Sequence, residues 1–293
     1  MADVDLKVVD PEASHLENTN SGQILQLDPN APSNWPKWKK NAQIIMVAFH
    51  SMVSTFMAAG IVPAYDTMAE TYGVTVTQAS YLTSIQILVL GIFPFVWRPL
   101  ASTYGRYHIS LLSVGGSMIV NIGAAWCTSY GSQMATRIIV AILICPPIGI
   151  GSGIVTELCE FEERAQKLGW WTLMTTIGTP AGPFIMGFVT KHIGMEWIFW
   201  IFAIMNFAQL VAYLLFGEET LYVPSDGTKD PTTTKDTRNV FIRNLIPRRI
   251  NPRPLKLIEF IDPLFMARLP RVMIPSFALG IAFCYGNIAI VVE

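Results

Sequence analysis

The sequence contains few charged residues. Lys, Arg, Asp and Glu make up 14% of its 293 residues, whereas 52% are hydrophobic. A soluble globular domain carries about 25% charged residues. Much of this chain is therefore expected to face something other than water. The net charge of −1 hides an uneven distribution, and the distribution is more informative than the sum.

Residue patterns that bind metals, nucleotides or nucleic acids are also missing. The four cysteines have no CxxC or metal-ligand spacing, and the four histidines are scattered along the chain. There is no G-x-x-x-x-G-K-[ST] motif, which disfavours an ATP-driven pump. Basic residues form no block typical of nucleic-acid binding outside one predicted loop. We expect no metal, no cofactor, no nucleic-acid partner and no enzymatic activity.

The first 40 residues contain no long apolar run. Residues 1–33 are rich in Asp, Glu, Asn, Ser and Pro, and they cannot bury enough apolar surface to offset the entropy lost on ordering. Residues 34–40 (NWPKWKK) place two Trp beside three Lys, which is typical of the cytosolic membrane interface. Residues 1–40 are therefore predicted to be a disordered cytosolic tail and a membrane anchor.

Apolar stretches follow, each long enough to cross about 30 Å of hydrocarbon. The predicted fold class is an all-α polytopic membrane protein. It has a six-helix transmembrane bundle at 41–217, a cytosolic linker at 218–269 and a seventh transmembrane helix at 270–293. Within the bundle, spans are expected near 42–62, 79–97, 109–127, 134–158, 169–187 and 196–216. Between them we expect loops, including an outer loop with Asp66 and Glu70 and inner loops at 98–108 and 157–168.

The cations lie almost entirely on one side of this predicted topology. Of the 20 Lys and Arg, all but two fall in the tail, in the inner loops, in the long linker or, for Arg271, at the very start of the seventh span. The two exceptions are Arg137, inside the fourth span, and Lys191, in an outer loop. Because basic residues near membrane ends mark the cytosol, the N-terminus and the linker are predicted to be cytosolic.

Several polar side chains fall inside the predicted spans and are able to line a substrate cavity: His50, Gln86, Asn121, Asn206 and Gln209. His50 has two interpretations. An ionisable group at that depth is a proton relay or substrate contact by default, or it is a neutral histidine hydrogen-bonded to another helix. No carboxylate lies well inside the six spans, so the usual proton carrier is absent from this region.

The fifth span, GWWTLMTTIGTPAGPFIMG, is rich in helix-breaking residues: Gly169, Gly178, Gly182, Pro183 and Gly187, together with Pro180. In a soluble helix, Gly costs ~1 kcal/mol and Pro ~3 kcal/mol relative to Ala. In a bilayer, neighbouring helices satisfy the freed backbone groups. Small residues also allow close helix approach, so the GxxxG pair favours a helix contact.

The full spacing of this stretch, G-x8-G-x3-G-P-x2-M-G, resembles the fifth-helix signature of major facilitator superfamily antiporters. In that signature a Gly-Pro kink is followed by paired glycines, and Met186 stands here in place of the first of the pair. The resemblance implies a gating and packing role for the glycines and Pro183.

Two further segments carry the resemblance. Residues 98–108 resemble a degenerate form of the superfamily's loop between helices 2 and 3, in which Gly105 and Arg106 match. Ser102 stands where the family has an acidic residue that latches the cytosolic helix ends, which puts that latch in doubt. The ETLY sequence at 219–222 resembles the end of helix 6 in fungal drug:proton antiporters.

The resemblance covers residue 34 to the end and implies the N-terminal half of a major facilitator. That half has six helices in 3+3 inverted repeats, followed here by a seventh helix, with the C-terminal half missing. It implies proton-coupled efflux of a small-molecule drug or specialised metabolite, with protons as the second partner, across a fungal plasma membrane. The alternative is a truncated carrier without transport activity, acting as a membrane scaffold or regulator or having no function.

The resemblance also bears on Arg137. The family carries an arginine at the start of helix 4 that is implicated in proton coupling, and Arg137 occupies that place. The other interpretation is an arginine that extends to the lipid headgroups. Either His50 and Arg137 provide the coupling, or the coupling group lies in the missing half.

Overall fold

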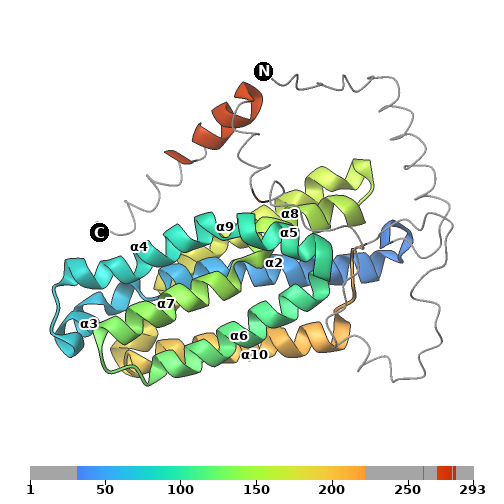
Figure 1. The fold of residues 1–293 in the computed structure, drawn as a ribbon. Coiled ribbons are helices and arrows are strands. Elements are labelled where there is room, and N and C mark those ends of the chain that lie inside the picture. The colour runs from blue at the N-terminus through green and yellow to red at the C-terminus, as the bar shows by residue number, and fades with distance from the viewer. Residues whose placement is uncertain (1–31, 222–259, 261–268, 279, 282–293) are drawn as a thin grey trace, which may run out of the picture.

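The computed structural model describes residues 32–221, 260, 269–278 and 280–281 (Figure 1). Within them the chain is helical and has no β-strand, which confirms the predicted all-α class. The predicted tail up to residue 31, most of the predicted linker and the end of the predicted seventh span lie outside the described residues. The start of the seventh span, residues 270–278, is helical.

The helices follow one another with short connections. In chain order they are η1 (Pro32–Asn34), α2 (Lys37–Ala59), η2 (Val62–Ala64), α3 (Tyr65–Tyr72), α4 (Val76–Ile92), α5 (Pro94–Tyr104), α6 (Arg106–Ala125), α7 (Tyr130–Ile144), α8 (Pro146–Leu158), α9 (Phe161–His192) and α10 (Glu196–Phe216).

Two of the predicted spans are broken at a proline. Pro94 begins α5 and Pro146 begins α8. Proline lacks the N–H and its ring clashes with the preceding turn, which favours a kink or a break at these two positions. The α4–α5 pair bends by 46°. At the second break, the Ile142 carbonyl, four residues before Pro146, accepts a hydrogen bond from the Trp97 indole at 2.7 Å, so the freed backbone group is satisfied inside the bundle.

Length and composition mark four stretches as able to cross a membrane: Lys37–Tyr72, Arg106–Ala125, Tyr130–Leu158 and Glu196–Phe216. The bent α4–α5 pair makes a fifth if it is one span. Helix α9 is not among them, although it has 32 residues. Its charged first turns and its Gly, Pro and Thr content lower its hydropathy. It packs against α2, α8 and α10 within the same bundle.

Helix α9 starts earlier than the sequence analysis predicted. The loop expected at 157–168 is largely helical, because α9 begins at Phe161. Glu162 and Glu163 lie in its first turn, where a negative charge favours the N-terminal end of the helix dipole. The outer loop predicted around Asp66 is likewise mostly helical, as α3.

The predicted loop at 98–108 is also wrong in detail. Residues up to Tyr104 belong to α5, and α6 begins at Arg106. Only Gly105 separates the two helices, with a φ of 93° that residues with a side chain rarely adopt. The glycine of the motif is therefore the turn itself.

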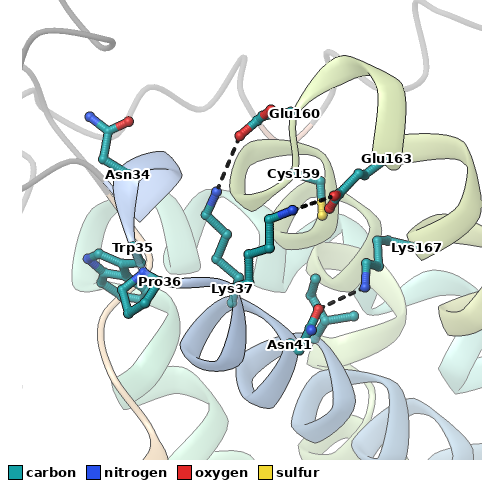
Figure 2. A pocket seen from close by; sticks show the side chains of 11 residues that line it. Asn34, Trp35, Pro36, Lys37, Asn41, Cys159, Glu160, Glu163 and Lys167 are labelled. Atoms are coloured by element: carbon teal, nitrogen blue, oxygen red, sulfur yellow. Dashed lines mark hydrogen bonds and ion pairs between the residues drawn. The ribbon is translucent and has the colours of Figure 1, made fainter.

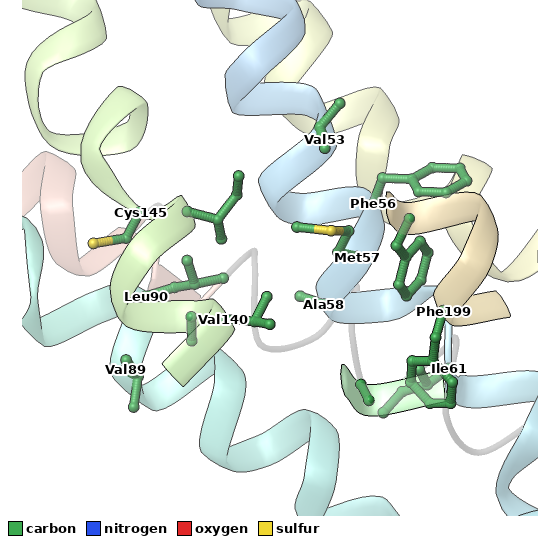
Figure 3. Close-up of a cluster of buried hydrophobic side chains, with 14 of the residues drawn as sticks. Val53, Phe56, Met57, Ala58, Ile61, Val89, Leu90, Val140, Cys145 and Phe199 are labelled. Atoms are coloured by element: carbon green, nitrogen blue, oxygen red, sulfur yellow. The ribbon is translucent and has the colours of Figure 1, made fainter. Parts of the chain in front are cut away.

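Helix α2 lies at the centre of the bundle, and α9, α8 and α10 all pack against it, while α6 packs on α10 and α7 (Figure 1). The main hydrophobic core is built along its length (Figure 3). Figure 3 shows side chains of this core from α2, α4, α7 and α10, including Val53, Phe56, Met57, Ala58, Ile61, Val89, Leu90, Val140 and Phe199.

One end of the bundle collects the basic residues. The start of α2, the α5–α6 junction, the α8–α9 junction and the end of α10 meet there. They are joined by Lys37–Glu163, Lys39–Glu218 and Arg106–Glu157 ion pairs at 3.6, 2.5 and 2.6 Å. We call it the basic end.

Two glycines of the fifth-helix signature bring α9 into backbone contact with α2. A Cβ on Gly178 would meet Thr55 Oγ1 and the Met52 carbonyl, and a Cβ on Gly182 would lie 2.7 Å from the Phe56 carbonyl. Thr55 Oγ1 also donates to the Thr175 carbonyl at 2.8 Å across the same contact. By contrast, nothing lies within 4 Å of a Cβ on Gly169, and Gly187 only touches Pro63 at 3.8 Å. Close packing therefore needs two of the four glycines.

This difference makes a matched pair of variants. Gly182→Ala forces a methyl group against a backbone carbonyl that cannot move aside, and such overpacking costs about 1–3 kcal/mol. Gly169→Ala meets open space and gains up to about 1 kcal/mol of helix propensity. Thermal unfolding of the purified chain in detergent should show a lower midpoint for Gly182→Ala and an equal or higher one for Gly169→Ala. Equal midpoints for the two variants would contradict the α2–α9 contact.

Candidate functional site

The polar residues predicted to line a cavity are buried inside the bundle. The solvent-exposed fraction is 0% for His50, Gln86, Asn121 and Asn206, and 3% for Gln209. Arg137 is 1% exposed. They belong to separate groups, which contact different helices and differ in how well their hydrogen bonds are satisfied.

Arg137 of α7 is the centre of the first group. Its Nη1 lies 3.3 Å from Gln86 Oε1 of α4. Its guanidinium carbon lies 4.6 Å and 5.6 Å from the ring centres of Phe199 and Phe202 of α10. Cations over aromatic faces are stabilised by the ring quadrupole, and the more so when water is excluded. Among the described residues no carboxylate forms an ion pair with Arg137.

This group has more hydrogen-bonding atoms than partners. Arg137 Nε and Nη2, Gln86 Nε2 and both polar side-chain atoms of Gln133 have no protein partner in the described part of the chain. Gln133 is fully buried and lies one helical turn before Arg137 on α7. A polar group buried without a partner costs about 1–3 kcal/mol. We call Arg137, Gln86 and Gln133 the Arg137 cluster.

Sequence reasoning missed Gln133. The fourth span was predicted to start at residue 134, so Gln133 was counted as loop, whereas α7 begins at Tyr130. The available signal was its spacing, because residues i and i+4 share one face of a helix. Gln133 and Arg137 have that spacing.

His50 of α2 is the centre of the second group, and its bonds are satisfied. Its Nδ1 lies 3.2 Å from the Tyr213 hydroxyl of α10, and its Nε2 lies 3.2 Å from Ser113 Oγ of α6. Each hydroxyl can donate or accept, so a neutral ring of either tautomer fits. The histidine thus ties α2 to two other helices. Gln209 of α10 adds a bond from its Nε2 to the Met46 carbonyl of α2 at 3.1 Å.

Asn206 and Asn121 meet around Met57. Their Nδ2 atoms lie 3.5 Å and 3.6 Å from the Met57 sulfur, and each also donates to the carbonyl four residues earlier on its own helix. Asn206 Oδ1 accepts from Ser117 Oγ at 3.0 Å. Amide groups held in this way join α2, α6 and α10, as polar residues do between membrane helices.

At the basic end, Glu219 holds the start of α6. Its carboxylate accepts hydrogen bonds from the backbone N–H groups of Arg106 and Tyr107 at 2.9 and 3.2 Å. Arg106 Nη2 in turn lies 2.6 Å from Glu157 Oε1, at the end of α8. Among the described residues, Ser102, which replaces the acidic residue of the family motif, bonds only to the Pro99 carbonyl of its own helix at 2.8 Å. Here Glu219 and Glu157 link the helix ends instead.

Two hollows lie toward the basic end, and neither is lined by the residues predicted to line a cavity. The first, of about 380 Å³, is bounded by the starts of α2 and α9. The second, of about 610 Å³, lies between α5 and α6 beside Trp97 and His108. No group of three or more His, Cys, Asp or Glu that could hold a metal occurs among the described residues.

Comparison with known proteins identifies relatives that match between 59% and 88% of the chain. Residues 47–292 match the family model described as Major Facilitator Superfamily. The efflux pump radE of Floropilus chiversii is 28% identical over 80% of this chain and 44% of its own length. The efflux pump vrtL of Penicillium aethiopicum is 32% identical over 59% of this chain and 35% of its own. Fluconazole resistance protein 1 of Saccharomyces cerevisiae is 25% identical over 88% and 48%.

A solved structure has the same fold. The peptide transporter POT in complex with sulfate superimposes with a TM-score of 0.58 at 15% identity, covering 90% of this chain and 50% of that chain. The chain spans about half the length of the curated relatives it matches. The helical bundle, the signature of α9 and the match over residues 47–292 lead to one conclusion: the chain belongs to the major facilitator superfamily.

Proposed function

We propose that this chain forms the N-terminal half, with one further helix, of a proton-coupled carrier that exports drugs or specialised metabolites. Its family consists of membrane transporters, and two of its relatives are named efflux pumps and a third is named for fluconazole resistance. The chain spans about half of their length, so transport by a complete carrier is part of the proposal. The carrier is proposed to be a multi-pass protein of the plasma membrane.

The buried Arg137 is the observation that carries this proposal. Bringing a cation out of water costs several kcal/mol unless an anion compensates it, and its described partners are an amide oxygen and two aromatic rings. A charged residue inside a membrane span marks function by default. We assign proton coupling to this cation, which the sequence analysis derived only from the family resemblance.

A fixed cation can couple proton release to movement. It lowers the pKa of any carboxylate that approaches it, so that the carboxylate gives up its proton, and the pKa rises again when the two separate. No described carboxylate forms an ion pair with Arg137. We therefore place the proton-carrying carboxylate in a second half of the carrier and assign Gln133 and Gln86 to positioning the guanidinium.

His50 receives a different role from Arg137. Both of its ring nitrogens have hydroxyl partners on other helices, which supports the second of its two interpretations, a neutral histidine that joins helices. Asn206, Asn121 and Gln209 have interhelical contacts of the same kind. We propose that these groups position α2 in the bundle, and that substrate is recognised by side chains that face the second half.

A second half would also cover apolar side chains that this half exposes. On α9, the exposed fractions are 70% for Phe184 and 59% for Phe188, and on α4 Leu88 is 56% exposed. Alternating access needs two bundles that rock around one site. The rival hypothesis, a scaffold or regulator without transport, rests on the same length difference from the relatives.

A transport assay separates these hypotheses. We expect the purified 293-residue chain in liposomes to insert but to move no amphipathic dye in response to a proton gradient, because one bundle cannot alternate. Replacing residues 270–293 by the C-terminal six-helix half of a fungal efflux pump should restore gradient-driven dye movement. Gradient-driven movement by the chain alone that is lost in Arg137→Gln would contradict the need for a second half. A joined protein that assembles but moves no dye would favour the scaffold.

Stability measurements test whether Arg137 is functional or structural. A buried charge retained for function can be replaced by an apolar residue of similar volume with little loss, whereas a structural ion pair loses about 3–5 kcal/mol. We expect the free energy of unfolding of Arg137→Met in detergent to lie within about 1 kcal/mol of the parent value or above it. The joined carrier with the same substitution should lose coupled transport. A large loss of stability with transport retained would assign Arg137 to the fold.

The proposed orientation has its own test. The cation distribution supports a cytosolic location for the basic end. In a chain whose own cysteines are replaced by Ala, Glu70→Cys at α3 should react with an impermeant thiol reagent applied to intact cells. Phe161→Cys, where the side chain is 85% exposed at the start of α9, should react only after permeabilisation. The reverse pattern would invert the topology.

A further inference from the structure

The hollow at the basic end is a pocket between two helix starts, away from the residues assigned to transport (Figure 2). It has a volume of about 380 Å³ and is lined by η1, the first turns of α2, the end of α8 and the first turns of α9. Figure 2 shows Glu160, Glu163 and Lys167 on one side of it and Lys37 and Asn41 on the other. We call it the Lys pocket.

Three lysines line this pocket, Lys40 and Lys167 at its wall and Lys37, whose side chain is 86% exposed, at its rim. Lys37 Nζ lies 3.6 Å from Glu163 Oε1, and Lys40 Nζ lies 4.0 Å from Glu160 Oε1. Lys167 Nζ donates to Asn41 Oδ1 at 2.8 Å. The Lys40 side chain is only 13% exposed, so its ammonium is held at the wall of the pocket. These cations come from two helices, and the pocket lies between them.

The start of α2 adds to this positive potential. Helix α2 has no acidic residue in its first turn and no side-chain hydrogen bond at its N-cap, Pro36. Its first turn instead contains Lys37, Lys39 and Lys40. The N-terminus of a helix carries about half a positive charge and favours anions, so cations in this position are unfavourable. An anion in the pocket would compensate both the lysines and the helix dipole.

The present partners of the lysines are weak competitors. Glu160 and Glu163 have side chains that are 78% and 47% exposed, and their ion pairs are long. Ion pairs this exposed to solvent contribute little to stability. A phosphate offers more charge and several acceptor oxygens, so its hydrogen bonds to ammonium groups are shorter and stronger. The other residues that line the pocket carry no formal charge, and burial raises the pKa of the Cys159 thiol among them.

From this geometry we propose that the Lys pocket binds a phosphate group, held by Lys37, Lys40 and Lys167. The same chemistry is found in the headgroup of an anionic phospholipid and in a soluble phosphate monoester. Trp35 in the pocket wall and the exposed Trp38 and Ile45 beside it on α2 provide apolar surface next to the phosphate position. The site does not depend on the proposed transport function.

The test uses the full purified chain in a phosphate-free maltoside detergent. Calorimetric titration with inorganic phosphate and with glycerol 3-phosphate measures the soluble arm, and native mass spectrometry with phosphatidic acid measures the lipid arm. Saturable binding in either arm supports the pocket, and the arm that binds identifies the source of the phosphate. The absence of saturable binding in both arms overturns the proposal.

Variants locate the binding. The pair Lys40→Gln and Lys167→Gln, combined, should weaken binding at least tenfold, and the control Lys191→Gln at the far end of α9 should leave it unchanged. The double variant Glu160→Gln and Glu163→Gln should bind phosphate more tightly, because the competing carboxylates are removed. If these residues had only a structural role, binding would not tighten. Unchanged binding in the lysine double variant, or weaker binding in the glutamate one, would show that the phosphate binds elsewhere.

Discussion

The backbone contact between α2 and α9 is the constraint on which the rest of this bundle depends. Gly178 and Gly182 leave no room for a side chain between the two helices, and small residues of this kind drive association in lipid, where apolar burial gives no advantage. With α9 fixed on one side, α2 presents its other sides to α8 and α10. His50 of α2 lies on the side that meets α10 and α6.

Buried polar groups in the described part of the chain differ in how completely they are hydrogen-bonded. His50, Asn206 and Ser54 are bonded across helices: Ser54 Oγ, for example, donates to the Ile144 carbonyl at the α7–α8 break at 2.9 Å. In lipid an unpaired polar group costs several kcal/mol, so such bonds hold the fold together. The Arg137 cluster lacks this completeness among the described residues. Incomplete satisfaction is expected where a group must change partners during a cycle.

At the basic end, too, specific contacts hold the helices together. The family motif between helices 2 and 3 is degenerate in sequence, yet the helix ends are linked. Glu219 caps α6 and Arg106 pairs with Glu157. A carboxylate from the end of the sixth span thus provides a link that Ser102 cannot. The ETLY segment was predicted only as a family signature. Its first residue, Glu219, also has a structural role, because it links the helix ends.

Sequence alone determined the helical class, the approximate positions of the helices, the family and the charge asymmetry, because hydropathy and small-residue spacing are local properties of the chain. It also selected Gly178 and Gly182 from their spacing, and Arg137 from the family resemblance. It could not give the partners of His50, the incomplete bonding of Gln133 or the junction at Gly105. It also could not show that Lys37 and Lys167 line one pocket. Those features depend on which residues, distant along the chain, meet when α2, α9 and α10 pack, and only the tertiary structure decides that.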